Sequence, residues 1–323
     1  MKKKILLVGS GNMAYEYLKV LKALNKTVII VGRGKANVLK LKKLFPEFEY
    51  HYGGVDNYIS NCKNIPEIAI NTVNIDYLGS TSITLLLSGV KNLLIEKPGD
   101  LNLSVLKKIE KLSCKNNAVV SIAYNRRFYS STLHLIDLIN EDGGLLSSHF
   151  EFTEWVTTIG PHTHSKNALN KWILSNSSHV IDTVFHIIGD PLELNSKIFG
   201  KKNIEWHPSG SIFIGFGVSE YNIPFTYHSN WNSPGRWSIE LTTNKRRFYL
   251  KPMEKLFEQK LNSVQLNELK IDDNLDHQFK PGLYLQTKSF INSNFKNFQS
   301  IKDQIKSMEY YSIIAGYYSI MIE

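Results

Sequence analysis

The chain is poor in cysteine and has no long apolar run. It holds only two cysteines in 323 residues, Cys62 and Cys114. Two cysteines imply neither a disulfide framework nor a thiolate metal cluster, so we expect a reducing, cytoplasmic location. No apolar stretch approaches the roughly 20 residues that a membrane-spanning helix needs. The lysine-rich start runs into Ile5–Val8 and is then interrupted by Gly9 and Gly11, which predicts a buried first strand rather than a signal peptide.

Signatures of nucleic-acid binding are also missing, although the formal net charge is +9. The lysines and arginines are spread along the chain, so we expect no nucleic-acid partner. An anionic small ligand, such as a dinucleotide or a sugar nucleotide, would use the same charge. His162 and His164 lack a convincing third ligand, so we expect a polar loop there and no metal.

Residues 1–123 alternate between short β-branched runs and segments with helical periodicity. This alternation predicts a doubly wound parallel sheet with helices on both faces, a Rossmann domain. The predicted strands are Lys4–Val8, Thr27–Val31, Glu49–Tyr52, Ile68–Asn71, Asn92–Glu96 and Val119–Ala123, and the predicted helices include Met13–Leu24 and Leu103–Asn116.

A glycine-rich turn follows the first predicted strand. It reads Gly9-Ser10-Gly11-Asn12-Met13-Ala14. Gly9 permits a tight turn, Gly11 lets the backbone approach a pyrophosphate, and Ala14 allows close helix–strand packing. Because the turn opens a helix within a βαβ unit, it predicts a dinucleotide site rather than an ordinary glycine turn.

The end of the second predicted strand bears on the choice of cofactor. An NAD enzyme usually has an acidic residue there for the ribose 2′-hydroxyl. This chain has Gly32-Arg33-Gly34-Lys35 instead. Arg33 could pair bidentately with a 2′-phosphate, which favours NADP while leaving NAD possible. The alternative is a solvated basic loop.

A lysine lies at the end of the fifth predicted strand, within Ile95-Glu96-Lys97-Pro98. Ligands of such sheets bind at the carboxyl ends of the strands, so Lys97 is well placed for chemistry. Together with the glycine turn, this segment resembles the Gfo/Idh/MocA family of oxidoreductases. The glycine turn, Arg33 and this resemblance together predict a set of cofactor contacts: Gly9, Ser10, Gly11, Asn12, Met13, Arg33, Asn71, Asn74, Glu96 and Lys97.

Further segments extend the resemblance to about residue 250. Asn71-Thr72-Val73-Asn74 is similar to the family's loop along the cofactor, although Tyr77 stands where a histidine is frequent. Tyr124-Asn125-Arg126-Arg127-Phe128 resembles the motif that leads into the second domain. Trp172 and the following residues resemble the family's tryptophan and its Asp-x-x-x-His segment.

That segment also predicts a helix on its own residues. Ser175-Asn176-Ser177-Ser178 offers several N-caps, and Gly189 before Pro191 marks the end. The spacing of His179, Asp182 and His186 places all three on one helical face. Polar surface residues are the alternative interpretation.

These residues fit the proton chemistry of alcohol oxidation. We expect His186 to be the general acid/base, because histidine titrates near neutral pH. Asp182 would hold the substrate or orient the imidazole, and Lys97 would stabilise charge on the reacting oxygen. The resemblance implies the same trio. Ser177-Ser178 replaces the family's paired glycines, which together with His179 indicates an unusual substrate pocket.

Three residues are weaker candidates for substrate contact: Tyr124, Arg126 and His179. Arg126 or Arg127 could bind an anionic substrate, or either could form salt bridges at the domain junction. The aromatic residues of the second half, such as Trp231 and Trp237, are interpreted as core packing rather than ligand stacking.

Residues 124–323 predict an α+β domain. The predicted helix Ser131–Asn140 and a strand-like run through Glu154 precede the other strands, and a helix over Ile301–Ile322 ends the chain. The further predicted strands are Ser211–Val218, Phe225–Trp231, Trp237–Thr242 and Arg246–Leu250, with a turn at Thr243-Asn244. The resemblance implies a largely antiparallel, open-faced sheet and a homodimer or homotetramer.

The sequence therefore predicts an NAD(P)-dependent oxidoreductase. By the resemblance, its substrate is a carbohydrate hydroxyl or carbonyl, with a sugar nucleotide as one form of it. Two alternatives stay open: a reductase of a non-sugar carbonyl or imine, and a non-catalytic NADP-binding sensor or interaction protein.

Overall fold

The computed structural model describes residues 4–62 and 64–317, and the chain divides into two compact units. The first unit comprises residues 1–124 and 278–305, and the second comprises 125–277 and 306–323. We expected one boundary, after residue 123. The first crossing lies one residue later, but the return of 278–305 to the first unit differs from that expectation. None of the described helices is long and apolar enough to cross a membrane.

The first unit is built on a seven-stranded sheet with the strand order β15-β6-β5-β4-β1-β2-β3. Strands β1 to β6 are parallel, and β15 pairs antiparallel with β6. The strands are β1 (Ile5–Val8), β2 (Val28–Gly32), β3 (Glu49–Tyr52), β4 (Ile68–Asn71), β5 (Asn92–Glu96), β6 (Val119–Ala123) and β15 (Gln299–Ser300). The helices of this unit are α1 (Asn12–Ala23), α2 (Lys35–Leu44), α3 (Gly54–Asn61), α4 (Leu78–Leu87), α5 (Leu103–Lys115) and α10 (Leu283–Ile291).

The central strands of this sheet are buried along their whole length. Every residue of β1, β2 and β4 is buried, so both faces of the sheet are covered, as expected of a parallel sheet. All the carboxyl ends of β1 to β6 lie at one edge. The strand order reverses direction at β1, which has β2 on one side and β4 on the other, and ligands of such sheets bind at this kind of switch point.

The segment 278–305 joins this unit through long-range contacts. Helix α10 packs against α1, and Tyr17 of α1 lies 3.2 Å from the side-chain oxygen of Gln286 in α10. Strand β15 adds two residues to the edge of the sheet. The Tyr17–Gln286 contact joins residues 269 positions apart, and β15 pairs with a strand far earlier in the chain, so no local sequence pattern could predict these contacts.

The second unit contains an eight-stranded sheet with the order β14-β13-β12-β11-β7-β10-β9-β8. Only the β7–β10 pair is parallel. The strands are β7 (Ser147–Glu151), β8 (Pro191–Phe199), β9 (Ile212–Ser219), β10 (Pro224–Asn230), β11 (Ser238–Thr242), β12 (Arg246–Leu250), β13 (Phe257–Lys260) and β14 (Leu266–Glu268). Its helices within the unit are α6 (Ser130–Glu141), α7 (Lys166–Asn170) and α8 (Ser178–Ile188); α9 (Asn274–Gln278) and α11 (Ile301–Ala315) span the divisions between the units.

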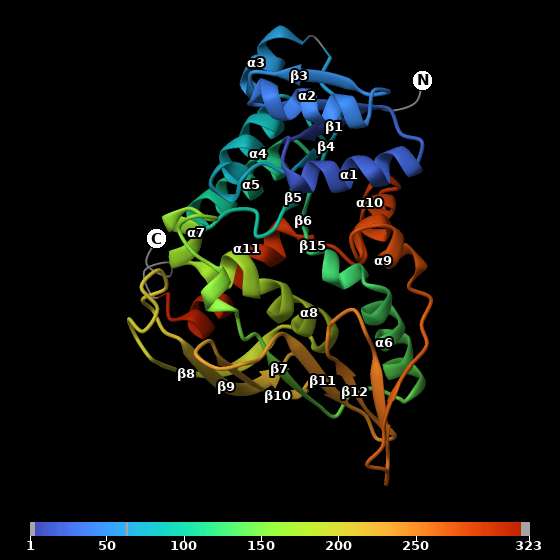
Figure 1. The fold of residues 1–323 in the computed structure, drawn as a ribbon, viewed down its shortest axis with the longest axis vertical. Helices are drawn as coiled ribbons and strands as arrows, with labels where there is room; N and C mark the ends of the chain where they lie inside the picture. Colours follow the sequence, from blue (N-terminus) through green and yellow to red (C-terminus); the bar gives the residue numbers. More distant parts are fainter. Residues whose placement is uncertain (1–3, 63, 318–323) are drawn as a thin grey trace. The chain divides into compact units, whose positions relative to one another are not determined.

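One face of this second sheet is covered and the other is open. Residues of β10 alternate between exposed and buried, and α8 lies across the sheet against β7 and β11 (Figure 1). Beneath α8, the ring of Phe150 stacks on Tyr227 at 5.3 Å, and Phe185 of the helix meets Phe225 edge-on at 5.2 Å. The α/β fold class is therefore confirmed: a parallel Rossmann sheet and a largely antiparallel, open-faced sheet.

Two expected elements are shorter than predicted. The strand expected to run through Glu154 ends at Glu151. The final helix, α11, ends at Ala315, and residues 318–323 of the expected Ile301–Ile322 helix lie outside the described residues. The hairpin turn at Thr243-Asn244 is present between β11 and β12.

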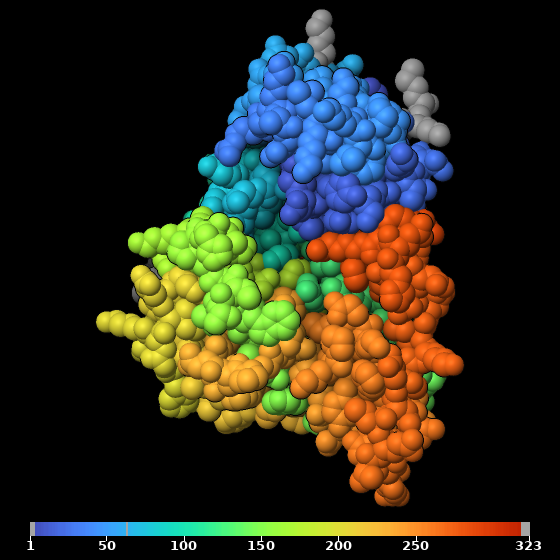
Figure 2. All heavy atoms as spheres, in the orientation of Figure 1, coloured from blue at the N-terminus to red at the C-terminus, as the bar shows by residue number. Residues whose placement is uncertain are grey.

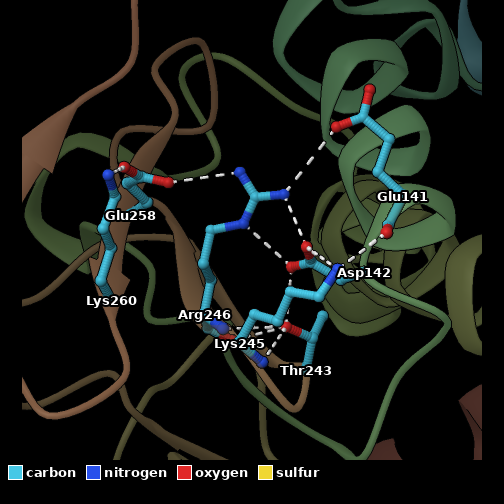
Figure 3. A network of polar contacts seen from close by, with 7 residues as sticks. All are labelled: Glu141, Asp142, Thr243, Lys245, Arg246, Glu258 and Lys260. Atoms are coloured by element: carbon cyan, nitrogen blue, oxygen red, sulfur yellow. Dashed lines mark hydrogen bonds and ion pairs between the residues drawn. The ribbon is translucent and has the colours of Figure 1, made fainter.

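A buried carboxylate ties α6 to β12 within the second unit (Figure 3). Asp142, with a side chain 2% exposed, accepts hydrogen bonds from Nε and Nη2 of Arg246 at 2.9 and 2.7 Å. Thr243 also donates to it, and the Lys245 ammonium lies 3.8 Å away. Arg246 holds the pKa of Asp142 below its usual range. Glu258 of β13 also accepts from Nη1 of Arg246, at 3.3 Å, and the orange segment that contains β13 and β14 reaches the visible surface in Figure 2.

Replacing Arg246 tests how much this network stabilises the unit. Arg246→Met should lower the free energy of unfolding by about 2 kcal/mol, because it leaves a buried carboxylate with weaker partners. Asp142→Asn in the same chain should restore most of that loss. Urea denaturation of the variants measures both, with Arg247→Met as control, since Arg247 is half exposed and pairs only with Glu240.

The stability difference between wild type and Arg246→Met should decrease as the pH falls. Because the pKa of folded Asp142 is lowered, the pair stabilises at neutral pH, and its contribution is lost as the pH falls through the folded pKa. The gap between wild type and Arg246→Met should therefore narrow below about pH 4. A gap that stays constant there would contradict an ionic contribution.

Candidate functional site

The glycine turn leaves an open helix N-terminus at the carboxyl edge of the first sheet. Gly9 has φ +125°, and a Cβ there would collide with the backbone and side chain of Thr72. Gly11 is exposed, precedes the first residue of α1, and has open space where a Cβ would lie. No side chain caps α1, and no acidic residue occupies its first turn. Its free N–H groups and positive dipole end therefore suit an anion such as a pyrophosphate.

The other residues of the turn have different exposures. Ser10 packs against Gly32 at the end of β2, where a Cβ on that glycine would lie 2.8 Å from the Ser10 Cβ. Asn12 is exposed, Met13 is half-buried, and Ala14 is fully buried. This agrees with close helix–strand packing at Ala14.

Arg33 lies at the end of β2 with its guanidinium exposed. It rests over the ring of Tyr77, 4.9 Å from the centroid, and forms no ion pair within the described chain. Lys35 lies over the ring of Tyr52 at 5.4 Å. Both cations are therefore held by aromatic faces and keep their N–H groups available. Tyr77, which stands where the resembled family often has histidine, supplies one of these faces.

The two asparagines of the loop after β4 have separate structural roles. Asn71 is fully buried, and its amide donates to the Leu78 carbonyl and the Ser82 hydroxyl, each at 3.0 Å. Asn74 is exposed and accepts from the Asp76 backbone N–H at 3.1 Å. Asn71 therefore shapes the loop, whereas Asn74 lies on its surface.

Glu96 and Lys97 end β5. The Tyr17 hydroxyl donates to the Glu96 carboxylate at 3.0 Å. Burial raises the pKa of Glu96, while the hydrogen bond from Tyr17 and the charges of Lys97 and Lys280 lower it in part. Burial likewise raises the pKa of Tyr17, and the Glu96 charge adds to that rise. Sequence reasoning missed the Tyr17–Glu96 hydrogen bond, because a tyrosine on an amphipathic helix cannot be distinguished from an ordinary core residue.

In the second unit, α8 continues directly from a π-helical turn, η4 (Ile173–Ser177). The expected N-caps are therefore absent: Ser175 and Ser178 donate to the carbonyls of Ala168 and Leu174, each at 2.8 Å. Ser177 donates to buried Glu154 at 2.7 Å. Because the π turn and α8 form one continuous helix, Ser175 and Ser178 donate to backbone carbonyls instead of capping a helix N-terminus.

Glu154 is a buried acid that the sequence did not single out. Its carboxylate also accepts from Asn176 at 3.1 Å and from Arg236 at 3.2 Å. Burial raises its pKa, while Ser177, Arg236 and Asn176 counteract the rise. Glu154 thus holds the π turn that leads into α8.

The Asp182 side chain is committed to Arg127. Nε and Nη2 of Arg127 donate to its two oxygens at 2.8 and 2.7 Å, and Asp182 is fully buried. Asp182 was expected to hold the substrate or orient the imidazole of His186. The structure differs from that expectation, because a buried carboxylate needs a full counter-charge and the bidentate guanidinium provides it. For Arg127 the sequence left two interpretations open, contact with an anionic substrate and a salt bridge, and the structure shows a salt bridge to Asp182.

His186 lies one turn further along α8 and is half-buried. Its Nε2 is buried without a hydrogen-bond partner in the described chain. Burial first, and then the charge of Arg127, lower its pKa to about 3. The imidazole is therefore neutral near pH 7 and presents a free ring nitrogen.

Arg126 and His179 both lie near the indole of Trp237. The guanidinium of Arg126 is 4.6 Å from the Trp237 ring centroid, and the His179 ring is 6.1 Å from it. Tyr124, in the first unit, is fully buried, and its hydroxyl accepts from Gln304 at 3.3 Å. His162 and His164 are exposed, with His164 edge-on to Trp172 at 4.7 Å. Across residues 4–62 and 64–317, no group of three or more histidines, cysteines or acids could hold a metal.

Comparison with known proteins adds structural likeness only. No protein-family model matches the chain, and no curated protein sequence does. Among solved structures, an oxidoreductase from Agrobacterium radiobacter in complex with NAD+, L-tartaric acid and magnesium has TM-score 0.75 and 13% identity, over 97% of this chain and 94% of that one. UDP-N-acetylglucosamine 3-dehydrogenase from Acidithiobacillus ferrooxidans has TM-score 0.74 and 10% identity, over 98% and 97%. A super-repressor mutant of Gal80p from Saccharomyces cerevisiae has TM-score 0.78 and 12% identity, over 100% and 96%. These likenesses establish the fold.

The fully buried His207 supports the π turn. The Nδ1 of His207 lies 2.9 Å from the Gly210 carbonyl, so it must be protonated, and Nε2 then accepts from the Tyr317 hydroxyl at 2.6 Å. The same hydroxyl accepts from the backbone N–H of Ile173 at 3.2 Å. Burial lowers the pKa of His207 to about 4.

Stability should therefore fall in mild acid. His186 and His207 have folded pKa values of about 3 and about 4, below the ordinary 6.5. The unfolded chain binds more protons between these values, so stability is lost as the pH falls below about 6.5, by up to about 1.4 kcal/mol per pH unit for each histidine. Urea denaturation between neutral pH and about pH 4.5 measures the slope.

Replacing each histidine singly shows which one causes the loss of stability as the pH falls. His186→Asn and His207→Asn should each reduce it, whatever their effect at neutral pH, while exposed His162→Asn should leave it unchanged. A slope that persists in the double variant His186→Asn/His207→Asn would contradict the assignment.

Proposed function

We propose that the chain is an NAD(P)-dependent oxidoreductase of the Gfo/Idh/MocA type. The observation that carries the proposal is the uncapped, exposed N-terminus of α1 behind Gly9 and Gly11, at the switch point of a parallel sheet. Lys97 ends β5 of the same sheet, and the fold is shared with an oxidoreductase bound to NAD+.

The residues of the first unit fit a dinucleotide. The N–H groups of Gly11, Asn12 and Met13 would bind the pyrophosphate, and exposed Asn74 is available at the neighbouring loop. Arg33, free of any carboxylate and stacked on Tyr77, would bind a 2′-phosphate, so we expect a preference for NADP over NAD. A bound nicotinamide would supply the hydride donor or acceptor.

The second unit supplies a group that can hold a proton. His186 is neutral near pH 7, and its Nε2 has no hydrogen-bond partner in the described chain, so we propose this nitrogen as the acceptor of the substrate's hydroxyl proton. A pKa of about 3 makes the imidazole a weak base, so this role requires its pKa to rise when cofactor and substrate bind. Lys97 would stabilise negative charge on the reacting oxygen. Asp182 acts through Arg127: the pair fixes α8 and places a positive charge near His186.

We propose a carbohydrate hydroxyl or carbonyl as the substrate, with a sugar nucleotide as one form of it. A fold neighbour named as a UDP-N-acetylglucosamine dehydrogenase supports this class. A reductase of a non-sugar carbonyl or imine is the enzymatic alternative. We further propose a cytoplasmic homodimer or homotetramer, in keeping with the open face of the second sheet.

A non-catalytic sensor is the second candidate function. The observation that favours it is that Asp182 is fully engaged by Arg127, which leaves one member of the expected trio without a direct role. A super-repressor mutant among the fold neighbours is compatible with it. Such a protein would bind the cofactor but would not turn over substrate.

Cofactor binding is the first test. Fluorescence titration should show NADPH binding more tightly than NADH. Arg33→Gln should weaken NADPH binding at least about 10-fold, because it removes a charge-assisted bidentate contact, and should change NADH binding little. Lys107→Gln, an exposed charge on α5, is the matched control.

The outcomes separate the parts of the proposal. Tighter binding of NADH would reject the role of Arg33 and keep the oxidoreductase. Binding of neither dinucleotide, in folded protein free of retained cofactor, would reject the proposed function.

Turnover tests the proton-transfer residue. With a panel of sugars and sugar nucleotides, His186→Gln should lower kcat by about 100-fold or more and leave NADPH affinity unchanged. Lys97→Met should lower kcat far more than it weakens cofactor binding. Equal turnover by wild type and His186→Gln would remove His186 from the mechanism, and cofactor binding without any turnover would favour the sensor.

A further inference from the structure

Arg126 is a largely buried cation without an acidic partner. It belongs to the short helix η2 (Asn125–Phe128), forms no ion pair in residues 4–62 and 64–317, and has a buried Nε with no hydrogen-bond partner. Its neighbour Arg127 is paired with Asp182, and Arg236 is paired with Glu154. Arg126 is therefore distinguished from both by its missing counter-charge.

Arg126 and a second arginine, Arg236, both lie against the indole of Trp237. The guanidinium of Arg126 lies 4.6 Å from the Trp237 ring centroid, and that of Arg236 lies 4.4 Å from it. Arg126 also lies 5.6 Å from the ring of Tyr129. The Trp237 Nε1 is a second buried donor without a partner in the described chain. We call Arg126, Trp237, Arg236 and His179 the Trp237 cluster.

The charges around Arg126 do not balance. Glu154 is engaged by Arg236, Ser177 and Asn176, and the charge of Glu254 reaches Arg126 only from beyond ion-pair distance. The positive charge of Arg236 opposes that of Arg126, and burial lowers the pKa of Arg126. Contacts with aromatic rings offset only part of the free-energy cost of removing a guanidinium from water. An apolar side chain at position 126 would avoid this penalty, so folding alone does not explain the arginine.

We propose that Arg126 binds an oxyanion, a carboxylate or a phosphate, carried by the substrate. The Nε of Arg126 is buried, so the two Nη groups would donate charge-assisted hydrogen bonds to the oxygens of the anion. The Trp237 Nε1 is a further donor in the same cluster. The cluster adjoins α8 at His179, on the helix that carries His186. This inference rests on the proposed function for the use of the bound anion, but the binding itself does not require turnover.

The experiment measures binding without any redox step. Isothermal titration of the full-length protein at low salt would compare D-glucose, D-glucuronate and D-glucose 6-phosphate. We expect at least one of the two anions to bind at least about 10-fold more tightly than D-glucose, and Arg126→Gln to abolish that preference. Arg247→Gln removes the same charge from a half-exposed site in the same unit, and it should leave the preference intact.

Thermal stability provides an independent readout. Arg126→Gln should leave the melting temperature unchanged or raise it, because it removes an uncompensated buried cation. A fall in melting temperature with unchanged anion affinity would assign Arg126 a purely structural role and overturn the proposal. No preference for either anion in wild type, or the same preference in Arg126→Gln, would also overturn it.

The two anions distinguish the sources of the charge. A preference confined to D-glucuronate identifies a carboxylate, and one confined to D-glucose 6-phosphate identifies a phosphate. Anion binding that depends on Arg126 in a protein that binds neither NADPH nor NADH would reject the proposed function while supporting this site. Normal NADPH binding without any anion preference would support the proposed function and reject the Arg126 site.

Discussion

The candidate site in the second unit depends on the buried, bidentate ion pair between Arg127 and Asp182. This pair joins η2 to α8 at the point where both elements are buried. With Asp182 neutralised in this way, the Arg127 charge contributes to the low pKa of His186. The adjacent Arg126 does not pair with that carboxylate, and its guanidinium lies over the ring of Trp237 instead. Removing either partner would leave an uncompensated buried charge at the centre of the candidate site.

The first unit depends on close backbone approach rather than on charge. Gly9 can follow β1 only because it has no Cβ, since any side chain there would collide with Thr72 after β4. That approach brings two loops together at the switch point and leaves the α1 N-terminus open. The cations that surround it are held by aromatic rings, Arg33 by Tyr77 and Lys35 by Tyr52. Acidic partners would have neutralised both cations and reduced their attraction for phosphate.

The departures from the sequence predictions share a physical origin. The serines at 175–178 look like N-caps because capping is a local property, but the helix continues through them as a π turn that Glu154 and Tyr317 hold from elsewhere. Asp182 is spaced correctly for His186, yet its partner comes from 55 residues earlier. Segment 278–305 returns to the first unit through α10 and β15. In each case a distant partner overrides a pattern that is readable over a few residues.

The sequence by itself determined the alternation of strands and helices, the glycine turn and the spacing of the α8 face. Apolar periodicity and backbone freedom act over a few residues, so composition at neighbouring positions is enough to predict them. Only the tertiary structure decided which side chains are committed and which are available. The polar atoms of Asn71 and Asp182 are already hydrogen-bonded within the protein. Arg33, Arg126 and His186 each have nitrogen atoms that remain available to a ligand. Hydrogen-bond and charge satisfaction depend on partners brought together by folding, and the order of residues along the chain does not specify them.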